Sequence, residues 1–177
     1  MSRPALSPFS AVVLLLVGEG GAGAHDLVRM ARQGRIYSDY AESQYYAEPK
    51  RLEKLGYLTS HTEPGRTRPR TVYRLTEAGR DALREWVKDP SPFSRIQMEP
   101  AWRLIAADIV GDEAVLESLR GLRDEIADLR ARLDVAEGIA PTVEGRERYL
   151  MLNHRLARKI VDAHAKWLDE VERELGD

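Results

Sequence analysis

The spacing of apolar residues predicts a mainly helical chain with one short pair of strands near its middle. Residues 9–17 are apolar almost all round, which is typical of a helix buried in a small core, and Ser7-Pro8 is a favourable helix start. Apolar residues recur at helical spacing over 24–32, which indicates a second helix. The glycine-rich segment 18–23 lies between these helices, and we interpret it as a turn.

The segment from Asp39 to Gly56 predicts a third helix whose start has two interpretations. Asp39 and Glu42 have the spacing of a capping box, which favours an early start. Pro49 lies inside the segment, and a proline within a helix removes a hydrogen bond at a cost of about 3 kcal/mol. The alternative is therefore a helix that starts at Glu48–Pro49. The inward face is predicted to hold Tyr45, Tyr46, Leu52 and Leu55.

Two β-prone runs follow this helix, at 58–63 and 70–75, and a loop rich in Arg, Pro and Gly joins them. Thr76 is predicted to cap a fourth helix, which ends before Pro90. A helix followed by a hairpin is the order of parts in a winged helix-turn-helix domain. In such a domain the helix enters the major groove of DNA while the hairpin reaches along the phosphates. We therefore predict a DNA-binding domain over residues 1–90.

Beyond Pro100 the pattern is helical throughout. From Asp112 the apolar residues alternate in steps of four and three, a heptad pattern that packs a helix along a partner. These positions are Val115, Leu119, Leu122, Ile126, Leu129 and Leu133. Thr142 is predicted to start a last helix of about 33 residues, roughly 50 Å long. Its apolar side holds Tyr149, Leu152, Leu156, Ile160, His164, Trp167, Val171 and Leu175. Leu150, Val161 and Leu168 widen this side, so it is expected to contact more than one neighbour.

These patterns together predict a fold that is mainly α with a small β-hairpin. An N-terminal winged helix-turn-helix would be followed, over residues 91–177, by antiparallel helices that serve dimerisation and effector binding. A long helix that outruns a small winged-helix core needs a packing partner, which is why we expect a dimer.

Charge is unevenly distributed, although the formal net charge is only −2. Residues 1–90 hold 14 Lys and Arg against 11 Asp and Glu, whereas residues 91–177 hold 13 against 18. The stretch 43–74 concentrates seven Lys and Arg against three Glu. A basic front half and an acidic back half favour a polyanion-binding module joined to one that stays off the polyanion.

Several classes of site are excluded or disfavoured. The chain has no cysteine, which excludes disulfides, thiolate nucleophiles and cysteine-based zinc sites. Its four histidines lack metal-ligand spacing and no nucleophile–base arrangement occurs, so we predict neither an enzyme nor a cofactor. The segment Gly18–Gly23 matches the dinucleotide pattern G-x-G-x-x-G, but no alternation of strands and helices follows to build a parallel sheet. The apolar run 11–17 is too short to span a bilayer, so we expect a cytoplasmic protein with no membrane partner.

Two linked stretches give the chain a resemblance to a known family. Residues 46–58, YAEPKRLEKLGYL, and residues 68–79, RPRTVYRLTEAG, are followed by Trp86. In order and spacing they resemble the recognition helix, wing and following helix of the PadR family of bacterial winged-helix transcription regulators. The resemblance is closer to the branch with a long helical C-terminal region, and it covers roughly residues 6–88.

The resemblance implies a set of DNA-binding residues. Gln44, Tyr45, Lys50 and Arg51 would face the groove, and the wing contacts would be Arg66, Arg68 and Arg70. The residues themselves add Lys54, which lies within about one turn of Lys50. For the three cations of this helix, an ordinary solvated face with local ion pairs remains the alternative.

The resemblance further implies homodimers formed through the C-terminal helices and, often, a small aromatic or drug-like effector. Trp102 and Trp167 are weak candidates for the effector pocket. The function that we expect is a ligand-responsive homodimeric repressor that binds a palindromic operator in double-stranded DNA. Its half-sites would lie about 34 Å apart, or a multiple of that. The alternative is a helical dimerisation or adaptor module that binds an acidic protein through its basic hairpin.

Overall fold

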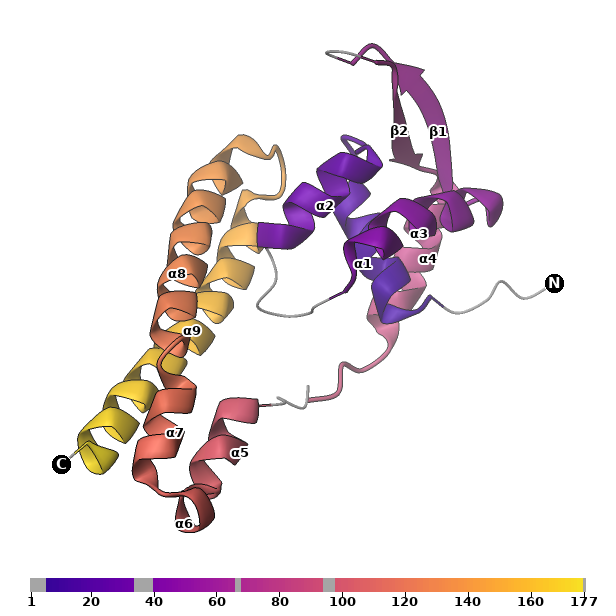
Figure 1. Ribbon diagram of the computed structural model, residues 1–177. Helices are drawn as coiled ribbons and strands as arrows, with labels where there is room; N and C mark the ends of the chain where they lie inside the picture. The colour runs from indigo at the N-terminus through magenta and orange to yellow at the C-terminus, as the bar shows by residue number, and fades with distance from the viewer. Residues whose placement is uncertain (1–5, 34–39, 66–67, 94–97, 177) are drawn as a thin grey trace. The chain divides into compact units, whose positions relative to one another are not determined.

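The computed structural model describes residues 6–33, 40–65, 68–93 and 98–176 (Figure 1). It divides into two compact units, Met1–Phe93 and Ser94–Asp177, whereas the sequence suggested a boundary at 90. The chain is mostly helical and carries one antiparallel hairpin, which confirms the predicted fold class.

The first unit begins with two helices, α1 (Pro8–Val17) and α2 (Ala24–Gln33). The cap predicted for α1 is confirmed, because the Ser7 hydroxyl oxygen accepts a hydrogen bond from the Ser10 backbone N–H at 3.1 Å. The core of this unit forms where α1 packs against its neighbours. Its most deeply buried members are Val13, Leu14, Leu27, Leu52, Tyr57 and Leu58.

The third helix, α3 (Glu42–Lys54), runs unbroken through Pro49, so the interpretation that started it at Glu48–Pro49 was wrong. The Pro49 ring is fully buried, and this apolar burial offsets the hydrogen bond that the proline cannot make. The start of α3 also differs from the expected capping box. The Gln44 side-chain oxygen accepts from the Ala41 backbone N–H at 3.0 Å, while Asp39 lies outside the described residues.

The hairpin pairs β1 (Leu58–Glu63) with β2 (Arg70–Leu75), and Glu63 lies opposite Arg70 in the register. The glycine-rich segment between α1 and α2 lies along β2. There, Ala22 and Tyr73 each donate a backbone hydrogen bond to the other, both 3.0 Å long. The segment therefore forms an isolated β-bridge to the hairpin, and its glycines serve this close approach.

The last helix of the first unit is α4 (Glu77–Lys88). Its predicted cap is confirmed, because the Thr76 hydroxyl oxygen accepts from the Gly79 backbone N–H at 3.1 Å. The same hydroxyl donates to the Gly56 carbonyl at 2.7 Å. This second bond ties the start of α4 to the turn that separates α3 from β1.

The second unit consists of helices, with a short 3-10 turn at Ala140–Thr142. The helices are α5 (Glu99–Ile105), α6 (Ala107–Val110), α7 (Asp112–Leu119), α8 (Leu122–Ile139) and α9 (Glu147–Leu175). The sequence suggested that the last helix begins at Thr142, but α9 begins at Glu147. Gly145 adopts a φ of 70° just before α9, a left-handed conformation that no helical residue has.

Helices α8 and α9 pack side by side as an antiparallel pair (Figure 1). Ion pairs fix their register, since Arg123 contacts Asp169 at 2.7 Å and Arg130 contacts Asp162 at 2.7 Å. Moving seven residues forward on α8 therefore corresponds to moving seven back on α9. Helix α7 also contacts α9. Four heptad positions are buried in this unit, Val115 and Leu119 on α7 and Ile126 and Leu133 on α8.

The apolar side predicted for α9 is only partly the buried one. The buried residues are Ala157, Val161, Ala165, Leu168 and Val171. The side chains of Tyr149, Leu152 and Leu156 are instead 68%, 52% and 54% exposed. At 100° per residue, this stripe lies about 130° round the helix from the buried face. The sequence placed the buried Val161 and Leu168 at the margin of the apolar side. The alanines beside them allow close helix packing, but small side chains carry little weight in an apolar pattern.

Candidate nucleic-acid interface

Helix α3 has one buried and one exposed side. The buried residues Tyr45, Pro49 and Leu52 follow each other at steps of four and three. An opposite stripe with the same helical spacing is fully exposed. It consists of Ser43, Ala47, Lys50 and Lys54. Lys50 and Lys54 therefore extend from one face of α3 into solvent, as a helix that enters a major groove requires.

Tyr45, which the family resemblance assigned to the groove, is a core residue. Only 4% of it is exposed, and its ring meets the Phe9 ring edge-on with centroids 5.1 Å apart. Burial raises the pKa of the Tyr45 hydroxyl. The neighbouring Tyr46, expected inside, is 45% exposed. Adjacent helical residues point about 100° apart, so only one of two consecutive tyrosines can reach the core.

Arg51, which was predicted to face the groove, donates hydrogen bonds to residues of its own domain. Its Nε donates to Glu48 Oε2 at 2.8 Å, and its Nη2 donates to the Ser10 hydroxyl oxygen at 2.9 Å. The Ser10 hydroxyl in turn donates to Glu48 Oε1 at 2.7 Å. The hydrogen bonds from Arg51 hold the pKa of the Glu48 carboxyl below its usual value, despite the opposing effect of burial.

Arg70 lies at the base of the wing and is also engaged. Its Nη1 contacts Asp26 Oδ2 at 3.0 Å, and its Nη2 contacts Glu63 Oε2 at 3.1 Å. Arg70 is therefore paired, although no glutamate is interleaved with the arginines of the hairpin tip. Glu63 comes from the opposite strand and Asp26 from α2, so sequence proximity did not reveal either pairing.

The other wing arginines differ from Arg70. Arg68 is exposed and forms no ion pair with any of the residues that the structure describes. Arg66 lies outside the described residues. Gln44, the remaining groove candidate, is exposed at the first turn of α3, where its side-chain oxygen accepts from Ala41.

The wing continues directly from the end of α3 that carries Lys54. The Ser60 hydroxyl on β1 donates to Glu53 Oε1 at 2.6 Å, and the Tyr57 backbone N–H donates to the Leu52 carbonyl at 2.9 Å. Figure 1 shows the hairpin projecting beyond the helices of its unit. The unit thus combines a helix with an outward cationic stripe and a projecting two-stranded arm anchored to the end of that helix.

Sequence reasoning missed the buried Ser10 and the roles of Glu48 and Asp26. Ser10 had one detectable signal, because it is a polar residue inside an otherwise apolar run. A buried hydroxyl needs hydrogen-bond partners, but two of the three partners of Ser10 lie 38 and 41 residues away in the sequence. Only the packing of α1 against α3 identifies them.

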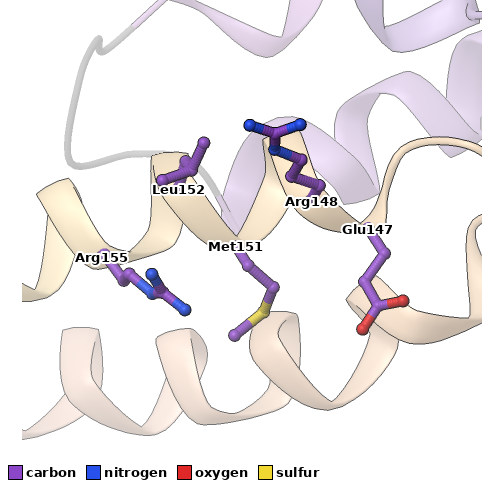
Figure 2. A pocket seen from close by; sticks show the side chains of 5 residues that line it. All are labelled: Glu147, Arg148, Met151, Leu152 and Arg155. Atoms are coloured by element: carbon purple, nitrogen blue, oxygen red, sulfur yellow. The ribbon is translucent and has the colours of Figure 1, made fainter.

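In the second unit, the two tryptophans proposed for an effector pocket are not enclosed. Trp102 is 61% exposed, and Trp167 is half-buried. A shallow pocket of about 370 Å³ lies instead on the first turns of α9 (Figure 2). It is lined by Glu147, Arg148, Met151, Leu152 and Arg155. Figure 2 shows Arg148 and Leu152 pointing to one side of α9 and Met151 to the other.

Within the described ranges, no group of three His, Cys, Asp or Glu side chains is arranged to hold a metal ion. No helix in the part of the chain that the structure describes combines the length and the apolar character needed to cross a bilayer.

Comparisons with known proteins agree with this architecture. Solved structures that resemble the chain include the virulence activator AphA of Vibrio cholerae, at a TM-score of 0.72 and 24% identity over 94% of this chain and 97% of that one. PadR of Bacillus subtilis in complex with operator DNA gives 0.71 and 17%, over 96% and 98%. The same protein in complex with p-coumaric acid gives 0.66 and 17%, over 96% and 99%. No curated protein matches the sequence significantly.

The comparison with family models identifies the domain that carries the winged helix. The model described as the transcriptional regulator PadR-like family matches residues 27–85, which run from α2 through α3 and the hairpin into α4. Over these residues, the chain is similar to the PadR-like family of transcriptional regulators.

Proposed function

We propose that this chain acts as a homodimeric repressor that binds a palindromic operator in double-stranded DNA and is released by a small aromatic effector. The main support is the outward stripe of α3, where Lys50 and Lys54 are exposed beside a projecting wing that carries Arg68. Lysines and arginines in this arrangement neutralise phosphates while the helix lies along base edges. Because the target is DNA, we expect the protein to act in the cytoplasm.

Exposed apolar side chains of the second unit support the homodimer. Trp102, Ile105 and Ile109 are 61%, 75% and 83% exposed, and the α9 stripe of Tyr149, Leu152 and Leu156 is exposed as well. Monomeric soluble proteins rarely leave many large apolar residues together in solvent. A second copy of the chain would remove them from water. Two-fold symmetry would then present two α3 helices to half-sites about 34 Å apart, or a multiple of that.

The effector is proposed by analogy and from side-chain chemistry. The solved structure of Bacillus subtilis PadR with p-coumaric acid contains an aromatic acid, and this fold is shared by the chain. Trp102 and Trp167 offer aromatic surfaces in the second unit, and they remain our candidates for an effector site. The two α3 helices of the dimer bind DNA only in one relative arrangement. An effector that binds a different arrangement more tightly would shift the dimer away from the DNA-binding one. Release of the operator would then relieve repression.

The decisive experiment measures binding of the full chain to fluorescently labelled duplexes by anisotropy over a series of salt concentrations. Selection from a pool of random duplexes first supplies a preferred sequence. We expect a palindromic preferred sequence and an affinity that falls steeply with salt, with a slope of about −0.9 per phosphate neutralised. Failure to retain any duplex, even at low salt, would contradict DNA binding. It would favour the adaptor alternative, in which the basic hairpin binds an acidic protein.

A further inference from the structure

We infer that Arg51 is a positioning residue, which locks helix α3 to helix α1 through Ser10 and Glu48 and does not contact DNA phosphates. The inference deepens the proposed function and rests on it. It separates Arg51 from Lys50, its immediate neighbour in the sequence. The first would set the orientation of α3, and the second would contact DNA.

The hydrogen bonds of Ser10 have a single consistent arrangement. Ser10 is fully buried, and its hydroxyl lies 2.7 Å from Glu48 Oε1, 2.9 Å from Arg51 Nη2 and 2.7 Å from the Ser7 hydroxyl. A carboxylate only accepts and a guanidinium only donates. The one Ser10 proton therefore goes to Glu48, and Ser7 must donate its own proton to Ser10. The Ser10 oxygen thus accepts from both Ser7 and Arg51, which satisfies it completely.

Glu48 is the centre of this arrangement. Its side chain is only 12% exposed, and both carboxylate oxygens accept hydrogen bonds, one from Ser10 and Arg51 and the other from Arg51 Nε. This two-point contact occupies the Nε/Nη2 edge of the guanidinium, which is one of its two edges that can bind a phosphate through two hydrogen bonds. If Arg51 turned toward DNA, it would leave a largely buried carboxylate without its cation, which is strongly unfavourable.

Lys50 provides the contrast within the same turn of α3. It is exposed, lies on the stripe with Lys54, and forms no ion pair with any described residue. Arg51 is also half-exposed, at 53% of its side chain, so exposure alone does not separate the two roles. The two residues differ in their hydrogen-bond partners. The hydrogen bonds from Glu48 and Arg51 to Ser10 connect α1 to the middle of α3. They fix the rotation of α3 about its axis, and hence which of its side chains face solvent.

The test compares four full-length variants with the wild type, on the selected duplex and on an unrelated duplex, over a salt series. For Arg51→Ala and Glu48→Gln we expect binding to the selected duplex to weaken about tenfold, as for a lost charged hydrogen bond, with an unchanged salt slope. For Lys50→Ala we expect the slope to fall by about one on both duplexes. Arg51→Lys keeps the charge but not the two-point contact, so it should behave like Arg51→Ala.

A double variant and a folding control complete the design. If Arg51 and Glu48 act as one unit, the variant with both Glu48→Gln and Arg51→Ala should lose no more affinity than either single variant. Thermal unfolding and circular dichroism identify any variant that fails to fold. Should Arg51→Ala be such a variant, Arg51→Lys and Glu48→Gln carry the test, because both preserve side-chain size.

Two results would show that Arg51 contacts DNA directly. A phosphate contact at Arg51 would lower the slope by about one in Arg51→Ala and leave Arg51→Lys close to the wild type. It would also make Glu48→Gln bind both duplexes more tightly, since the competing carboxylate charge is gone. Either result overturns the inference while leaving DNA binding intact. A wild-type chain that binds no duplex overturns both.

Discussion

Ala22 and Tyr73 exchange two backbone hydrogen bonds, each 3.0 Å long, and so anchor the wing to the connection between the first two helices. This pairing explains two of the glycines that precede α2. The close approach of the two backbones leaves little space for a Cβ at Gly21 or Gly23. These two glycines therefore serve the fold, although the spacing of the segment matches a nucleotide-binding pattern.

The first prediction tests this close approach. Gly21 has a φ of 79°, and a Cβ added there would lie 2.8 Å from the Tyr73 carbonyl oxygen. We expect Gly21→Ala to lower the free energy of unfolding by about 1–3 kcal/mol, measured by urea denaturation. Gly20→Ala is the matched control, since nothing lies within 4 Å of its added Cβ. Equal stability of the two variants would contradict the role assigned to the bridge between Ala22 and Tyr73.

The second prediction concerns the wing. Arg68 is exposed and has no ion-pair partner among the described residues, so its guanidinium is available for phosphate. We expect Arg68→Ala to weaken binding to all duplexes and to lower the salt slope by about one. Arg173→Ala, which removes an exposed arginine from the second unit, is the control for net charge. An unchanged slope in Arg68→Ala would remove the wing from the interface.

The parts of the fold that were predictable from the sequence depend on residues close together in the chain. Ser7 and Thr76 cap their helices through atoms three residues away, and the hairpin strands have the predicted bounds. The run of helices beyond Pro100 was also evident. Such features follow from local hydrogen bonding and from side-chain periodicity, which a single sequence displays directly.

The parts that were not predictable depend on tertiary packing. Tyr45 and Tyr46 are chemically alike neighbours, and only the position of Phe9 decides which one is buried. Likewise, the carboxylate partners of Arg70 lie on α2 and β1, and the distant hydroxyl partner of Arg51, Ser10, lies on α1. The basic cluster identified the class of partner, but contacts across the fold determine which of its cations remain available.

The third prediction tests the dimer. Leu156 on α9 is 54% exposed and belongs to the stripe with Tyr149 and Leu152. If a second copy covers this stripe, Leu156→Asp buries a charge in the interface and should convert a dimer to a monomer in sedimentation equilibrium. Lys166→Asp, an exposed position outside the stripe, should leave the dimer intact. A wild-type chain that sediments as a monomer would contradict the proposed homodimer.

The fourth prediction is a pH dependence of stability that arises from His154 on α9. Its Nδ1 is buried and has no hydrogen-bond partner among the residues that the structure describes, and burial lowers the pKa of the ring below the usual 6.5. The nearby charge of Glu137 raises that pKa, but the effect of burial is larger. The folded state therefore favours the neutral ring, whereas the unfolded state takes up a proton near pH 6.5.

The sign of the effect follows from proton binding. Between the lowered folded pKa and 6.5, the unfolded chain binds more protons than the folded one, so stability decreases as the pH falls through this window. The contribution is complete above pH 6.5 and lost below the folded pKa. Urea unfolding of the wild type and of His154→Gln, compared at several pH values from 7.5 downward, should show their difference in stability moving in favour of the variant as the solution becomes acidic. His164→Gln controls for loss of an imidazole from the same helix. A difference that stays constant with pH would show that His154 has the same affinity for protons in both states.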